Sequence, residues 1–204
     1  MQQRIENLKK ALLNQQDELD ADAEDQLRAV AYRVLASATI EEFVEKRCVE
    51  TAKAGIERFK KGDESSTARA LVTWLVVRNT PDVVPLEPQD VKSYFHLLDD
   101  AFKAYSASAS NNHGLDAKDL RNLVHPVGLR SHQVPEELAD RLQALADKRN
   151  PSVHASTLKI TRRTNPGIER DQVDAIVALL ERLDDELEIA ATTYPIPAPA
   201  AASL

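Results

Sequence analysis

An apolar stripe at helical spacing between Asp22 and Gly62 constrains the fold of this chain more than any other feature. Residues three and four positions apart share one face of an α-helix, so the stripe predicts one long amphipathic helix. Gly62 can end this helix as a C-cap, although Thr39 followed by Glu42 can also form a capping box that restarts it. The stripe consists of Leu27, Val30, Ala31, Val34, Leu35, Ala38, Phe43 and Val44.

The composition favours helices in the rest of the chain as well. Aromatic residues make up only 4% and there are 5 glycines, whereas Ala, Leu and charged residues recur throughout. This mixture suits helices better than pleated strands, so we expect an all-α bundle of about six to seven helices without a β-sheet. A chain of 204 residues can bury one good core. We therefore expect a single domain over residues 1–190, followed by a flexible tail over 191–204 that is rich in Pro and Ala and uncharged.

Apolar spacing, capping residues and prolines place the other helices. The small, polar run 106–114 is predicted to be a loop, and a basic connection is expected over 159–170. The expected helices are one built on Ile5, Leu8, Leu12 and Leu19 and interrupted by the acidic cluster 17–25, one from Ser65 or Ser66 to Asn79, one from about Gln89 to Tyr105, one from Asp116 to Pro126, one from Pro135 to Arg149, and one from about Glu169 to Ala190.

The charge and the single cysteine limit the classes of function. The formal net charge of −7 repels a polyanion, so any contact with nucleic acid has to be local. Cys48 has no second cysteine with which to form a disulfide or a Cys-rich zinc cluster. The irregularly spaced acidic runs match no calcium loop and are expected to be solvated, so no metal and no other cofactor is predicted. No stretch approaches a membrane span and no apolar leader begins the chain, so we expect a soluble, cytoplasmic protein.

The segment from Arg149 to His154 places a permanent cation and a titratable imidazole at the end of an amphipathic helix. Cleavage of RNA without a metal needs a group that deprotonates the 2′-hydroxyl, a group that protonates the leaving 5′-oxygen and a cation that stabilises the charge on phosphorus. One His and one Arg supply only part of this set. A symmetric dimer brings two copies of each around one axis, so we expect a homodimer whose two imidazoles divide the acid and base roles.

The backbone around Pro151 is predicted to break the helix. Proline lacks an N–H and disfavours helical backbone at the residue before it, so we expect a kink or a new helix start with Asn150 as N-cap. Residues five apart lie about 140° apart around a helix, so Arg149 and His154 are expected to flank a groove. An Arg followed by His at such a distance arises by chance roughly once in a chain of this composition, so spacing alone does not identify a site.

With this motif the chain resembles the HEPN superfamily, helical proteins marked by an Arg, a polar residue and then a His after a short fixed gap. Arg149, Asn150 and His154 fit that pattern residue by residue. Pro151 departs from it, because many members carry a residue there that lets the helix continue.

The wider context is similar to the RiboL-PSP and MAE-type HEPN-like nucleases. The similar segments are 28–44, Asn112-His113-Gly114 and the turn Pro126-Val127-Gly128, and the resemblance extends over about residues 5–190. It implies a helical bundle that dimerises across its motif helices and cleaves RNA without a metal, in toxin–antitoxin or antiphage-defence systems. The expected partners are RNA, a second copy of the chain and an antitoxin or defence protein.

The resemblance also implies roles for the residues of the motif. Arg149 would stabilise the phosphate, His154 would act as general acid or base, and Asn150 would orient the substrate or a partner side chain, with a 2′,3′-cyclic phosphate as product. The alternative is a catalytically inactive HEPN-like binding or regulatory subunit. Cations around the motif are candidates for holding the RNA backbone, although a solvated loop explains Arg162 and Arg163 equally well. They are Lys148, Lys159, Arg162, Arg163 and Arg170.

Other chemically active residues have simpler explanations. Arg121 and His125 repeat the motif with one residue fewer, but a helix C-terminus that ends at Pro126 explains them better. His113 is interpreted as a turn residue, with a contact near the site or at an interface as the alternative. Packing or surface positions are expected for His96 and His132, a buried thiol for Cys48, and a core or interface position for Trp74.

Overall fold

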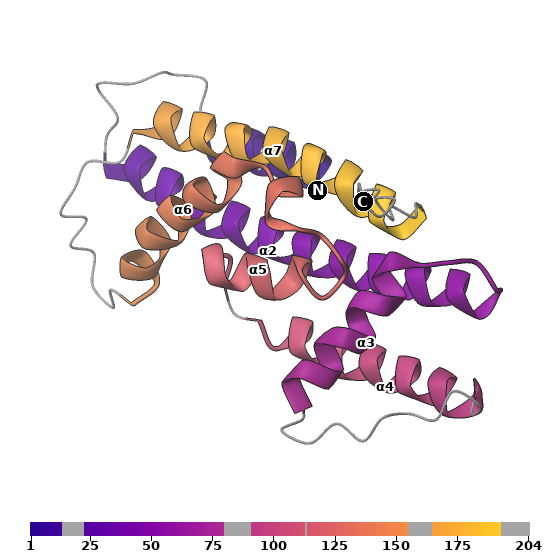
Figure 1. Ribbon diagram of the computed structural model, residues 1–204. Helices are drawn as coiled ribbons and strands as arrows, with labels where there is room; N and C mark the ends of the chain where they lie inside the picture. Colours follow the sequence, from indigo (N-terminus) through magenta and orange to yellow (C-terminus); the bar gives the residue numbers. More distant parts are fainter. Residues whose placement is uncertain (14–22, 80–90, 113, 155–164, 193–204) are drawn as a thin grey trace, which may run out of the picture.

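The computed structural model describes residues 1–13, 23–79, 91–112, 114–154 and 165–192, and for residues 79, 91–93 and 150–154 it describes the backbone alone (Figure 1). All regular structure in these ranges is helical, as predicted, with seven α-helices and no strand. The elements are α1 (Gln2–Leu12), α2 (Ala23–Lys60), α3 (Ser66–Asn79), α4 (Val91–Ser110), α5 (Ala117–Val124), the 3₁₀ turn η1 (Ser131–Gln133), α6 (Glu136–His154) and α7 (Pro166–Thr192). None of the described helices is long and apolar enough to cross a membrane.

The long helix predicted from the apolar stripe is present as α2, and the other helices pack around it. It runs without a break through Thr39, whose hydroxyl donates to the Leu35 carbonyl, so the capping box that would restart it is absent. Gly62 ends it in the left-handed region at φ +92°, as predicted for a C-cap. Figure 1 shows α7 running alongside α2, with α5 and α6 beside it and the α3–α4 pair near its C-terminal end.

The face of α2 that enters the core is not the one that the apolar stripe predicts. The core line is Tyr32, Ala36, Ile40, Val44, Cys48, Ala52 and Ile56. Residues two apart lie about 160° apart around a helix, so most of the predicted stripe points the other way. The outer face of α2, formed by Leu27, Ala31, Val34, Leu35 and Ala38, leaves Leu27 48% and Leu35 46% exposed. The predicted buried face was wrong because the N-terminal half of α2 is apolar on two sides. Small side chains such as Ala36 let the neighbouring helices approach the side that became the core.

Several predicted caps are confirmed, because a cap depends on residues close in sequence. The Asp116 side chain accepts hydrogen bonds from the backbone N–H groups of Lys118 and Asp119, both at 2.8 Å. Ser65 Oγ accepts from the Ala68 N–H at 3.1 Å and begins α3, as expected.

Three predicted boundaries were wrong. The helix expected to end at Tyr105 continues as α4 to Ser110, because Tyr105 and Ala109 are both buried and this packing outweighs the loop preference of the Ser-rich run. The last helix begins at Pro166, after the cap Asn165, which accepts from the Gly167 N–H at 2.8 Å. It ends at Thr192, so the expected tail boundary at 191 falls inside α7, and the remainder of that tail lies outside the described residues.

The predicted break at Pro151 is also corrected. Helix α6 continues from Glu136 through Pro151 to His154, so Asn150 is not an N-cap. Pro151 lacks only its own N–H donor, and a helix can lose one such bond close to its end.

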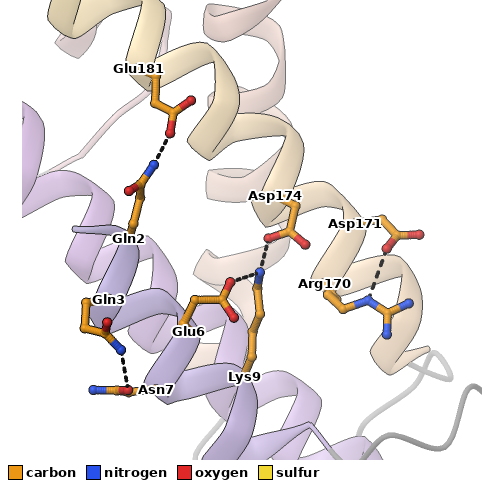
Figure 2. A network of polar contacts seen from close by, with 9 residues as sticks. All are labelled: Gln2, Gln3, Glu6, Asn7, Lys9, Arg170, Asp171, Asp174 and Glu181. Atoms are coloured by element: carbon orange, nitrogen blue, oxygen red, sulfur yellow. Dashed lines mark hydrogen bonds and ion pairs between the residues drawn. The ribbon is translucent and has the colours of Figure 1, made fainter.

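Helix α1 is fixed to α7 by polar contacts around a half-buried lysine (Figure 2). Lys9 Nζ pairs with Asp174 of α7 and, at 2.6 Å, with Glu6 one turn earlier in α1. Burial alone would lower the pKa of Lys9, but the contacts with Asp174 and Glu6 raise it overall. The same lysine lowers the pKa of Glu6 below its usual value of 4.5. The contact is therefore strongest when both carboxylates are ionised.

Acidification is expected to weaken this α1–α7 contact. The lowered pKa of Glu6 contributes stability that is complete above the unfolded-state pKa and is lost as pH falls through the folded-state pKa. Lys9→Met removes the cation, so its melting temperature should lie below that of the wild type at about pH 6 and approach it at about pH 3. Thermal unfolding of both proteins at both pH values measures this, and an equal difference at the two pH values would contradict it.

Candidate functional site

Arg149 is held between α6 and α2. Leu138, Leu142 and Leu145 form the buried face of α6, and Arg149 follows Leu145 by four residues, so it lies on the same side of the helix. Its Nη1 donates to Glu41 Oε2 at 2.8 Å and to Ser37 Oγ at 3.3 Å. The side chain stays 25% exposed. The guanidinium is therefore positioned, and partly neutralised, by α2.

A polar cavity of about 220 Å³ lies beside this guanidinium. Three parts of the chain that are distant in sequence meet there: α2, the first turn of α5 with the segment before it, and α6. The cavity is lined by Ser37, Gly114, Leu115, Asp116, Asp119, Leu142, Gln143, Leu145, Ala146 and Arg149. A small ligand inside it would contact one cation, two carboxylates and an apolar wall.

The two carboxylates of the cavity have different roles. Asp116 is occupied as the N-cap of α5. Asp119 accepts a backbone hydrogen bond from Asp116, and a Cβ atom at Gly114 would collide with its Oδ2, so a side chain at position 114 would require the carboxylate to move. Burial, and then the neighbouring charge of Asp116, raise the pKa of Asp119. Together with Glu41 these groups make the surroundings of Arg149 acidic.

A buried ionic network fixes the turn of α6 that precedes Arg149. Arg33 of α2 and Glu169 of α7 form an ion pair, with Nε 3.1 Å from Oε2 and side chains only 8% and 5% exposed. Arg33 Nη1 also donates to the backbone carbonyl of Lys148 at 2.9 Å. Lys148 Nζ lies 3.4 Å from Glu169 Oε1 and donates to Gln172 Oε1 at 2.6 Å. The network thus ties α2, α6 and α7 together one residue before Arg149.

The structure brings together only part of the predicted site. Asn150 and His154 belong to α6, but the structure describes only their backbone. Three further predicted residues lie outside the described ranges altogether, namely Lys159, Arg162 and Arg163. Lys148 is engaged with Glu169 and Gln172. Arg170 lies in the first turns of α7, not in a connecting loop, and Nε pairs with Asp171 at 3.3 Å (Figure 2).

The residues that contact Arg149 were not predicted from the sequence. Ser37 and Glu41 lie four apart on α2, and that spacing was a signal for two polar side chains on one helix face. Asp119 follows the cap Asp116 by three residues, the spacing of a reciprocal cap. Arg33 and Glu169 carried no such signal, because each is an ordinary charged residue until α2 and α7 pack together.

The competing positions lie elsewhere in the molecule. Arg121 and His125 are exposed at the end of α5, and His125 is its C-cap, as interpreted from the sequence. His96 and His132 are exposed, and His113 lies outside the described residues. Cys48 is fully buried, and burial raises the pKa of its thiol to about 12, which fits the expected inert core thiol.

Trp74 is half-buried in α3 at the packing face with α4. It meets Tyr105 edge to face, with ring centroids 5.8 Å apart, and Arg78 lies 5.1 Å from its ring centroid. These contacts place Trp74 in the packing between α3 and α4, in keeping with the predicted core or interface position.

In comparisons with known proteins, no protein-family model, curated protein or solved structure matches the chain. The function is therefore inferred from the residues of the candidate site.

Proposed function

We propose that this protein is a metal-independent endoribonuclease of the HEPN type that acts as a homodimer, in the manner of a toxin or antiphage effector. One observation carries the proposal. Three segments on which the resemblance rests, 28–44, 112–114 and the motif, supply Ser37, Gly114 and Arg149 to a single cavity. The meeting of these three segments at one cavity beside Arg149 is what supports the proposal.

The roles of the residues follow from the chemistry of RNA transesterification. The 2′-oxygen attacks phosphorus, its proton passes to one imidazole, the bond to the 5′-oxygen breaks and the other imidazole protonates that oxygen. We assign the two imidazoles to His154 of the two protomers, the contact with the phosphate to Arg149, and the orientation of the substrate to Asn150. Lys148, Lys159, Arg162, Arg163 and Arg170 would hold the flanking RNA backbone.

The outer face of α2 supports dimerisation. Leu27 and Leu35 are about half exposed on a helix that also supplies Ser37 and Glu41 to the surroundings of Arg149. An exposed apolar stripe next to a candidate site marks an interaction surface. A second copy docking there would bring its own motif close to the first.

A second candidate function is favoured by the ion pair between Arg149 and Glu41. A guanidinium that already has a carboxylate partner at 2.8 Å, in a chain of net charge −7, also suits a catalytically inactive HEPN-like subunit of a defence or toxin–antitoxin complex. Expression separates the two candidates. A nuclease slows growth unless His154 is changed, and an inactive subunit has the same effect on growth with or without His154.

The proposed activity is tested with purified protein and RNA in excess EDTA. The wild type is expected to produce fragments ending in a 2′,3′-cyclic phosphate, detected by mass spectrometry, and His154→Ala should produce none above background. The proposal would be wrong if RNA stayed intact after incubation with the folded wild-type dimer, or if the wild type and His154→Ala cleaved it equally.

Glu41 is expected to compete with the phosphate for Arg149. Glu41→Gln retains an acceptor for Nη1 but removes the negative charge, so RNA affinity should rise by about fivefold at low salt. Fluorescence anisotropy with a 2′-O-methylated, uncleavable RNA measures this. The matched control is Glu42→Gln, the exposed neighbour that pairs with Arg4. Weaker RNA binding by Glu41→Gln, with Glu42→Gln unchanged, would mean that Glu41 orients Arg149 and does not compete.

A further inference from the structure

The cavity beside Arg149 has the character of a base-binding pocket. Its inner wall is apolar, formed by Leu115, Leu142 and Leu145, all buried, which suits the faces of a flat heteroaromatic ring. Its volume of about 220 Å³ leaves room for one small ring system. Arg149 belongs to the lining and its side chain is 25% exposed, so a nucleotide with its base in the cavity can present a phosphate to the guanidinium.

The polar lining favours a base with adjacent N–H donors. Asp116 Oδ1 accepts the two N–H groups that cap α5, which fixes that carboxylate at the helix start, whereas Asp119 accepts one backbone hydrogen bond and keeps acceptor capacity for a ligand. An ionised carboxylate only accepts hydrogen bonds, and its two oxygens pair best with two parallel N–H groups. Guanine alone among the RNA bases has two neighbouring donors, N1–H and N2–H₂, on its Watson–Crick edge. Gln143, also in the lining, donates one amide N–H to Asp147 Oδ1 at 2.9 Å, and its second N–H can donate to the guanine O6.

We infer that this cavity binds the base of the nucleotide whose phosphate contacts Arg149, and that Asp119 makes it selective for guanine. The inference rests on the proposed nuclease function for its biological meaning, but the binding can be measured without cleavage. Gly114 also lines the cavity, and a side chain at this position would require the Asp119 carboxylate to shift from the place it has in this structure.

The test is a calorimetric titration of the full chain with the four nucleoside 3′,5′-bisphosphates, which offer a phosphate on either side of the sugar. The wild type is expected to bind the guanosine compound at least about tenfold more tightly than the other three, the discrimination typical of a bidentate contact. Asp119→Asn retains an oxygen for the Asp116 N–H but has one acceptor fewer, and it should lose the preference. Asp140→Asn, an exposed change on α6, should keep it. Ala146→Leu narrows the cavity and should weaken binding of all four compounds.

The possible outcomes separate this inference from the proposed function. Equal affinity for the four compounds, an unchanged preference in folded Asp119→Asn, or no binding of any compound would overturn the base pocket even if RNA is cleaved. Selective binding of guanosine bisphosphate that is lost in Asp119→Asn, by a protein that leaves RNA intact in EDTA, supports the pocket and overturns the nuclease.

Discussion

Arg33→Met is expected to lower the free energy of unfolding by about 3 kcal/mol, because the buried Glu169 carboxylate loses its guanidinium partner. Both side chains of this pair are less than a tenth exposed. Removing one partner of a buried ion pair typically costs ~3–5 kcal/mol, and Lys148, 3.4 Å from Glu169, keeps the loss near the lower end. Urea denaturation followed by circular dichroism measures the difference.

Two further variants make this result specific to burial. Arg28→Met removes an exposed pair with Glu24 on the same helix and should cost less than about 1 kcal/mol. Arg33→Met combined with Glu169→Leu should regain most of the lost stability, since an apolar pair has no buried charge left unpaired. Equal losses for Arg33→Met and Arg28→Met would show that the network does not stabilise the packing of α2, α6 and α7.

Mixing His154→Ala chains with wild-type chains is expected to lower the rate of RNA cleavage by more than the fall in the wild-type fraction alone. If the composite site needs His154 from both protomers, only dimers of two wild-type chains are active. The rate should then fall with the square of the wild-type fraction, so an equal mixture at constant total chain concentration keeps about a quarter of the rate. Independent monomers would keep about a half. The chains are unfolded and refolded together, and initial rates are measured in EDTA.

A variant that cannot pair provides the control. Leu35→Glu places a charge on the outer face of α2, where the leucine is 46% exposed, so the monomer should fold but no longer dimerise. Light scattering should give the mass of one chain. The double variant Leu35→Glu, His154→Ala cannot pair with wild-type chains, so adding it should leave the rate of the wild-type dimers unchanged. Linear dilution by His154→Ala itself would rule out a site that needs both imidazoles.

Much of the fold could be predicted because it depends on local sequence. The length of α2, its end at Gly62 and the cap at Asp116 all follow from residues within a few positions of one another. The buried face of α2 did not follow, because its N-terminal half is apolar on two sides and the packing of the neighbouring helices selects one. The extension of α4 beyond Tyr105 to Ser110 likewise depends on packing between helices, because Ala109 is buried in the core.

The site was predictable only at its centre. Arg149 could be singled out from its own segment, whereas Glu41, the carboxylate that pairs with it, lies 108 residues away along the chain. Asp119 and Gly114 reach the cavity through the packing of α5 against α6. Side chains that meet across helices leave no mark in the spacing of either helix, so the acidic surroundings of Arg149 emerge only from the fold.

The proposed mechanism requires the guanidinium of Arg149 to contact the RNA phosphate. The decisive measurement is the single-turnover rate of RNA cleavage in EDTA by the wild type, by Arg149→Ala and by Arg121→Ala, an exposed arginine of α5 as control. We expect Arg149→Ala to lose about 10²–10³-fold in rate, as when a group that stabilises transition-state charge is removed, and Arg121→Ala to match the wild type. A folded Arg149→Ala protein that cleaves at the wild-type rate would contradict the account.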